Sequence, residues 1–228
     1  MKTKTLNHFK FKNVEFSKSC FRGAVTFLVL MFALAANSLA QPQYYNTNTG
    51  TGINTYPFGQ SGGQRVHWLI RPGTLNLPSQ CPPGNITKIY FYMGNTMTGT
   101  FTNLTVKLGQ TALTSLPGAW YTGAALATVY YRPSVTLSCT NSAWMSITLD
   151  TPFPFDTSQS LIIDVEQCAT TGTLYVRQSS GTPATRNYGQ PGTGCPINYI
   201  GQDGQIINFG VDIVTAGGCG YVWASQTS

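Results

Sequence analysis

The chain has 228 residues with 13 Lys and Arg against 7 Asp and Glu, and only 9% of its residues are charged, compared with about 25% in an average globular chain. Six of the basic residues and one acid lie within the first 40 residues, so residues 41–228 carry 7 basic and 6 acidic side chains and are nearly neutral. This balance argues against nucleic-acid binding, which needs clustered Lys and Arg to neutralise phosphates.

The first 40 residues have the layout of a secretory signal peptide. Basic residues precede an apolar run, Ala24–Ala36, and Ser38-Leu39-Ala40 follows as a small-x-small cleavage site. The apolar run is shorter than the roughly 20 residues of a transmembrane helix. We therefore expect residues 1–40 to be removed on export, and the remainder to be secreted or on the cell surface without stable membrane insertion.

Residues 41–63 are predicted to form a flexible N-terminal arm. The segment is rich in Gly, Asn and Thr but carries four aromatic residues: Tyr44, Tyr45, Tyr56 and Phe58. Each would forfeit roughly 1.5–3 kcal/mol if it stayed in water rather than being buried. We expect a neighbouring copy to receive them, with the arm acting as a donor strand. The alternative is that they fold back onto their own domain.

From residue 64 onward, apolar residues recur with period two, which is typical of half-buried strands. Clear cases are Thr87–Met93, Asn103–Gly109, Trp144–Leu149, Leu161–Glu166, Thr173–Arg177 and Gln205–Val214, and weaker ones are Arg65–Ile70, Leu126–Tyr131 and Ser134–Cys139. Turn-forming residues separate these segments, and Ser179–Gly194 is expected to be a long loop. The sequence predicts one all-β domain over residues 64–228. It is expected to be a two-sheet β-sandwich, jelly-roll or immunoglobulin-like, with about nine or more strands.

The phase of each strand predicts which side chains point inward. The expected core residues are Ile89, Phe91, Val106, Leu108, Ile147, Leu149, Ile163, Val165, Val176, Phe209 and Val211. The same phase puts Lys107, Asp164 and Asp212 on the solvent side.

Four aromatic residues fall in the polar phase of their strands: Tyr90, Tyr92, Trp144 and Tyr175. Outward aromatic side chains on a sandwich are suited to stacking on sugars or to contacting another protein. The alternative is that they cover a sheet face beneath a loop or beneath the N-terminal arm.

The sequence offers little catalytic chemistry. After residue 40 there is one histidine, His67, which is expected on the polar face of a strand. Gly59-Gln60-Ser61-Gly62-Gly63 matches the G-x-S-x-G nucleophile pattern, but a strand follows it and no later histidine exists, so a turn is favoured. Asp164 and Glu166 share a strand face, which more often means a solvated surface than a glycosidase pair. We expect no enzyme activity, metal site or cofactor.

Five cysteines follow residue 40: Cys81, Cys139, Cys168, Cys195 and Cys219. Export favours disulfides, and at least one is expected among the first four, although the sequence does not choose the pairing. Cys219, near the C-terminal end, is the candidate for the unpaired cysteine. Cys20 lies in the predicted signal peptide.

One stretch of the chain resembles a known module. Its elements are Tyr44-Tyr45-Asn46, Tyr56-Pro57-Phe58-Gly59, Arg65–Ile70, Pro82–Met93 and Leu104–Gln110. Together they resemble the N-terminal β-sandwich module of secreted cell-surface proteins of Bacteroidetes-type bacteria, which are often exported by type IX secretion. The resemblance implies an extracellular adhesive or architectural module without active-site residues.

Two functions are open at this point. The first is an extracellular structural subunit that assembles with copies of itself into a surface fibre or layer, using the N-terminal arm. The second is a carbohydrate-binding or adhesin module that uses the outward aromatic residues. The expected partners are other copies of the chain, or glycans and cell-surface proteins.

Overall fold

The domain consists of β-strands and connecting turns. The computed structural model describes residues 41–215 except 124, 182–183 and 191–193, and every regular element in this part is a strand. The all-β prediction is therefore confirmed. Among these residues there is no helix with the length and apolar character needed to span a membrane. The predicted signal peptide and Cys20 lie outside the described residues.

Fourteen strands follow one another along the described chain. They are β1 (Tyr44–Tyr45), β2 (Gly52–Asn54), β3 (Gln64–Ile70), β4 (Gly84–Tyr92), β5 (Met97–Thr111), β6 (Ala127–Cys139), β7 (Trp144–Phe155), β8 (Ser160–Gln167), β9 (Ala169–Thr170), β10 (Val176–Ser180), β11 (Arg186–Gly189), β12 (Gly201–Asp203), β13 (Gln205–Ile207) and β14 (Phe209–Val214).

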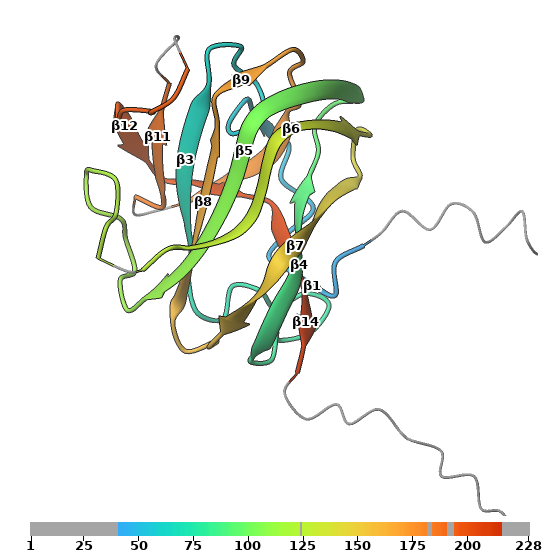
Figure 1. The fold of residues 1–228 in the computed structure, drawn as a ribbon. Helices are drawn as coiled ribbons and strands as arrows, with labels where there is room; N and C mark the ends of the chain where they lie inside the picture. Colours follow the sequence, from blue (N-terminus) through green and yellow to red (C-terminus); the bar gives the residue numbers. More distant parts are fainter. Residues whose placement is uncertain (1–40, 124, 182–183, 191–193, 216–228) are drawn as a thin grey trace, which may run out of the picture. The chain divides into compact units, whose positions relative to one another are not determined.

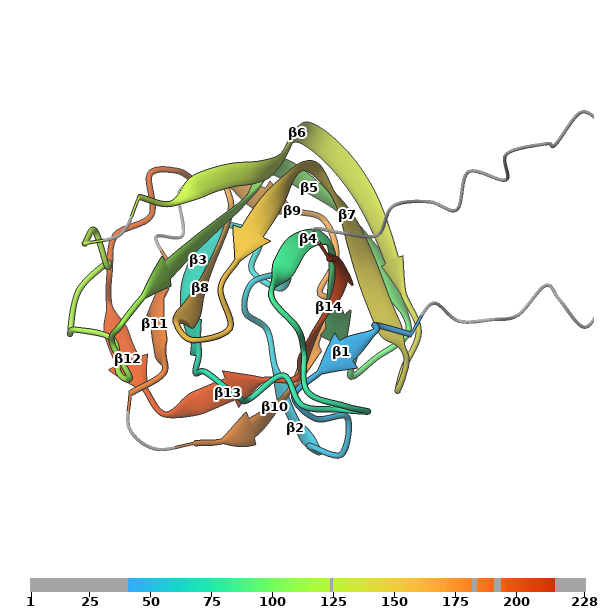
Figure 2. The same cartoon turned by 90° about the horizontal axis from the view of Figure 1, so that it is seen from below.

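The strands form three antiparallel sheets around one core (Figures 1 and 2). The four-stranded sheet has the order β1-β14-β4-β7, and the seven-stranded sheet has the order β12-β11-β3-β8-β5-β6 with β9 on β5. These two sheets supply the predicted sandwich. The third sheet, β13-β10-β2, was not predicted.

The third sheet exists because the predicted strand Gln205–Val214 is broken at Asn208. Its first half, β13, pairs with β10, and its second half, β14, pairs with β4. The Asn208 N–H donates to the Arg177 carbonyl, and the Asn208 carbonyl accepts from Tyr92 N–H, both at 3.0 Å. The backbone of Asn208 therefore joins two sheets.

The interior agrees with the strand phases. All eleven predicted core residues are buried, and each side chain is at most 7% exposed. Lys107 and Asp212 are only half-buried, as expected for the outer face, whereas Asp164 is buried. Period two therefore identified the inward face correctly on every one of these strands.

Residues 41–63 are part of the domain, so the prediction of a flexible arm was wrong. β1 pairs with β14, and β2 pairs with β10. Phe58 is fully buried between Phe91 of β4 and Phe101 of β5, with ring centroids at 5.1 and 5.6 Å. These two strands belong to different sheets, and the space between them receives the Phe58 ring. The structure agrees instead with the alternative prediction, in which residues 41–63 fold back onto their own domain.

The other aromatic residues of this segment also pack within the domain. Tyr45 is 9% exposed, and Tyr44 and Tyr56 are half-buried. Tyr45 packs against Trp144, and Tyr56 packs against Tyr188 of β11, each with ring centroids 5.4 Å apart. All four aromatic side chains pack on their own domain, although Tyr44 and Tyr56 keep part of their surface in solvent.

The predicted loop Ser179–Gly194 contains a strand, β11. It pairs with β3 on one side and with β12 on the other. Its residues, Arg186–Gly189, include no aliphatic side chain, so no period-two pattern marked it. β11 widens the seven-stranded sheet beyond the predicted strands.

Phe58→Ala should lower the free energy of unfolding by about 3–5 kcal/mol, because it leaves a cavity between the two large sheets. Urea unfolding measures this. Ile53→Ala in the same segment is the matched control, since Ile53 is 54% exposed and should change stability by only about 0.5 kcal/mol. Equal, small effects for both variants would contradict the packing of Phe58.

Candidate functional site

Two of the four aromatic residues predicted to face outward pack against each other. Tyr92 of β4 and Trp144 of β7 are cross-strand neighbours with ring centroids 4.9 Å apart. Tyr175 lies in the segment before β10, and its backbone carbonyl accepts a hydrogen bond from the N–H of Gly94, two residues after Tyr92. All three side chains are half-buried, so part of each remains open to a ligand.

Tyr90 lies on the outer face, as its strand phase predicts, but it is buried, so the prediction that it is open to a ligand was wrong for this residue. Its side chain is 1% exposed, and its hydroxyl donates to Asp212 Oδ2 at 2.7 Å. Its cross-strand neighbour is Gly210, and Pro42 packs directly over Gly210. The segment predicted to be a flexible arm therefore covers this part of the sheet. Burial, and then the hydrogen bond with Asp212, raises the pKa of Tyr90.

A groove of about 260 Å³ begins at Tyr92. We call it the Tyr92 groove. It is lined by Asn48, Thr49, Gly50, Thr51, Tyr92, Ser142 and Arg177. Its lining combines one aromatic ring, one guanidinium, hydroxyls and a side-chain amide, and it contains no carboxylate.

One wall of the groove is the segment between β1 and β2, which Asn46 holds in place. The Asn46 side chain donates to the Ile207 carbonyl at 2.8 Å and accepts from Phe209 N–H at 2.9 Å. It also accepts from Thr47 N–H at 2.7 Å. Asn46 thus satisfies backbone groups on both sides of the break between β13 and β14 and positions the residues that follow it.

Gly50 brings this wall close to β10. A Cβ atom on Gly50 would lie 2.5 Å from Ser179 Oγ and 2.8 Å from the Gln178 carbonyl oxygen, so only glycine fits without displacement. On β10, a second depression of about 430 Å³ shares residues 49–51 with the Tyr92 groove. Its other lining residues are Gly52, Gln178, Ser179, Ser180 and Gln205.

Arg177 of β10 is fixed beside Tyr92 by neutral groups. Its Nη2 donates to Asn141 Oδ1 at 3.1 Å and to Ser142 Oγ at 3.2 Å. Its Nη1 lies 3.4 Å from the Thr51 carbonyl oxygen and donates to it. The guanidinium therefore links the loop before β7 to the wall of the groove.

This arrangement suits reversible binding of a polar ligand. Sequence reasoning found Tyr92 but missed Arg177, Ser142 and the groove wall. The run Asn46–Gly52, in which Asn, Thr and Gly alternate, was a signal for a polar loop, but nothing local indicated which surface it would join.

A second polar cluster lies on the outer face of the seven-stranded sheet. His67 is on that face, as its strand phase predicts, yet it is fully buried because Trp120 packs over it with ring centroids 4.8 Å apart. His67 Nε2 lies 3.3 Å from Asp164 Oδ1. The Arg65 guanidinium donates to both oxygens of Asp164, at 3.0 and 2.8 Å, and lies over the Trp120 ring.

Asp164 and Glu166 do not form the solvated pair expected from the sequence. Asp164 is 2% exposed and Glu166 is half-buried. Burial by itself raises the pKa of Asp164, but its interactions with His67 and Arg65 outweigh burial, and its pKa falls to about 2. For Glu166, burial dominates and raises the pKa. Asp164 therefore stays ionised beneath Trp120 and holds Arg65 in place.

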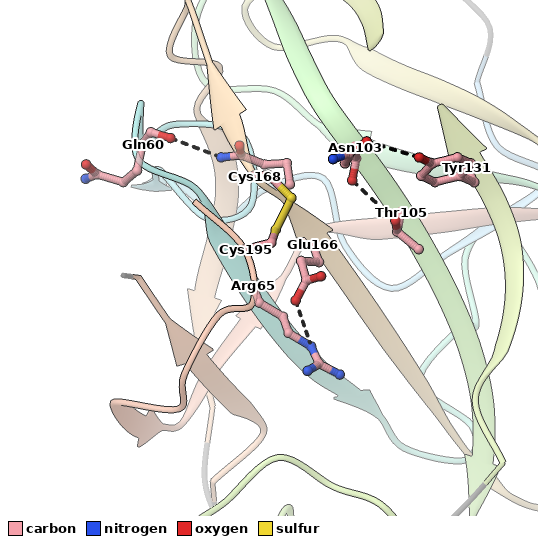
Figure 3. Close-up of a disulfide and its surroundings, with 9 residues drawn as sticks. Gln60, Arg65, Asn103, Thr105, Tyr131, Glu166, Cys168 and Cys195 are labelled. Carbon is pink, nitrogen blue, oxygen red and sulfur yellow. Dashed lines mark hydrogen bonds and ion pairs between the residues drawn. A yellow bond between two sulfur atoms is a disulfide. The ribbon is translucent and has the colours of Figure 1, made fainter. Parts of the chain in front are cut away.

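One disulfide among the described residues, Cys168–Cys195, links the residue after β8 to the segment between β11 and β12. It confirms the prediction of a bridge among the first four candidates. Figure 3 shows it near Gln60, whose carbonyl accepts a hydrogen bond from Gln167, and near the Arg65–Glu166 ion pair. Cys81 and Cys139 are buried free thiols. Burial raises the pKa of Cys81 to about 11, so this thiol is protonated at neutral pH. Cys219 lies outside the described residues.

The G-x-S-x-G segment is a turn that leads into β3. Ser61 is exposed at this turn, and no strand directly precedes it. Within the described part of the chain, no group of three or more His, Cys, Asp and Glu side chains is placed to hold a metal ion.

The chain matches no protein-family model and no curated protein.

Because the folded-state pKa of Asp164 lies near 2, below the roughly 3.9 of an unperturbed Asp, its ionised form stabilises the fold above pH 4. That stabilisation should be lost as the pH falls from about 4 to about 2. Asp164→Asn should remove this part of the acid dependence of the unfolding free energy, measured by urea titration at each pH. Asp150→Asn is the control, since the Arg132–Asp150 pair is exposed and should change the acid dependence less. An unaltered acid profile in Asp164→Asn would contradict the role of this group.

Proposed function

We propose that the chain is an extracellular binding module that holds a glycan in the Tyr92 groove. The observation that carries the proposal is the juxtaposition of the Tyr92 ring with hydroxyl, amide and guanidinium donors along one short groove. The aromatic face offers an apolar surface for a sugar ring, and the polar groups offer hydrogen bonds to its hydroxyls.

The dimensions support a ligand of a few sugar units. The groove, at about 260 Å³, is slightly smaller than a typical small-molecule pocket of roughly 300–1,000 Å³. The adjoining depression adds Gln and Ser side chains along the same wall. A sugar chain that stacks on Tyr92 can therefore continue past Gly50 onto β10.

Export is part of the same proposal. A disulfide within the domain supports an oxidising compartment, and the signal-peptide pattern at residues 1–40 agrees with it. The resemblance to cell-surface modules of Bacteroidetes-type bacteria leads us to place the protein at the cell surface, where a glycan-binding module would act in adhesion.

Self-assembly into a fibre or layer stays a prediction, but one route to it is weakened. Strand donation required a neighbouring copy to bury the aromatic side chains of Tyr44, Tyr45, Tyr56 and Phe58. These side chains instead pack within their own domain. Assembly would need a different surface. For this reason we favour glycan binding.

The test uses the full chain, expressed in an exporting host and screened on an array of purified oligosaccharides. For the best ligand, calorimetry should show about tenfold weaker binding by Tyr92→Ala, which corresponds to ~1.4 kcal/mol. Tyr131→Ala is the matched control, because Tyr131 is an exposed tyrosine on β6 of the other large sheet. Absence of any glycan ligand, or an equal loss in both variants, would contradict the proposal. Filaments in negative-stain micrographs of a sample that binds no glycan would favour self-assembly instead.

A further inference from the structure

The Tyr92 groove carries a positive charge that the described part of the protein does not neutralise. Arg177 is the one charged residue in its lining. None of the ion pairs formed among the described residues includes Arg177. Three other strand arginines differ in this respect, since Arg65, Arg132 and Arg186 each pair with an aspartate.

The guanidinium is nevertheless held in a defined position. Asn141, Ser142 and the Thr51 carbonyl accept its hydrogen bonds without cancelling its charge. Arg177 also lies opposite Ile53 in the pairing of β10 with β2, so its backbone is fixed in a sheet. A cation that is already positioned loses little freedom when an anion binds, which favours affinity.

The charge and the hydrogen-bond donors of the Arg177 guanidinium determine which ligand it favours. Both N–H groups of Arg177 Nη2 are occupied, Nε is buried, and Nη1 keeps one N–H after its bond to the Thr51 carbonyl. A carboxylate can accept one hydrogen bond from Nη1, and such a charge-assisted bond is stronger than a neutral one. A neutral sugar could accept a hydrogen bond from Arg177 but would leave its charge unpaired. A carboxylate on the sugar supplies both the hydrogen-bond acceptor and the opposite charge.

We infer that the Tyr92 groove selects acidic glycans, with the carboxylate of a uronic acid unit against Arg177 and a sugar ring against Tyr92. This inference rests on the proposed glycan-binding function and names its ligand class. It makes Arg177 the residue that determines specificity and Tyr92 the residue that supplies general sugar affinity.

The test compares a galacturonic acid oligomer with its methyl ester of the same length, which keeps the sugar but removes the charge. Calorimetry on the full chain should show at least about tenfold tighter binding of the free acid at low salt, with the preference shrinking as salt is added. Equal affinity for acid and ester would overturn the inference while leaving glycan binding intact. Binding of neither would overturn the inference, and the oligosaccharide array would then decide separately whether glycan binding stands.

Arg177→Gln tests whether Arg177 causes the preference for the free acid over the ester. It should abolish the preference for the acid while weak binding of the ester persists, and Arg177→Lys should retain part of the preference because the charge remains. Arg132→Gln is the control, since Arg132 is exposed and pairs with Asp150 away from the groove. A preference that survives in Arg177→Gln would overturn the assignment. If Arg177→Gln does not fold, as judged by thermal melting, Arg177→Lys and the salt dependence of the unmodified protein decide the question.

Discussion

The two large sheets are joined by a side chain that comes from outside both of them. Phe58 lies between β4 and β5, with Phe91 and Phe101 packed edge-on against its ring. Once this ring is in the core, the residues before it must run back along the domain, where β1 and β2 pair with β14 and β10. The wall of the Tyr92 groove is the short connection between these two strands. The candidate binding site therefore depends on a packing contact in the core.

Local alternation was sufficient to predict the strands whose partners are regular. On β4, β5 and β8, inward and outward positions follow from residues two apart, and the side chains predicted to face inward are all buried. Prediction failed where a distant segment decides the environment. Pro42 covers the sheet next to Tyr90, and Trp120 covers His67. In each case the strand phase was correct and the solvent exposure was not, because phase carries no information about what packs on the outer face.

The same limit applies to the site. Tyr92, Trp144 and Tyr175 stood out as aromatic residues in polar positions, and the structure brings the rings of Tyr92 and Trp144 into contact. Arg177 had no such signal, since an arginine on the polar face of a strand is common. Its importance comes from the contrast with Arg65 and Arg186, which have carboxylate partners. Only the folded arrangement reveals an arginine that lines the same groove as an aromatic ring and has neutral partners.

Amide chemical-shift mapping by NMR tests whether the folded N-terminal segment and β10 together form the binding groove. When a galacturonic acid oligomer is added to the labelled protein, chemical-shift changes are expected at Asn48–Thr51, Tyr92 and Arg177. No changes are expected at Thr105 and Lys107 on the outer face of the seven-stranded sheet. Shifts confined to that outer face would contradict this arrangement. So would unprotected solvent exchange at the Asn46 amide, which donates to the Phe209 carbonyl when the segment is folded on the domain.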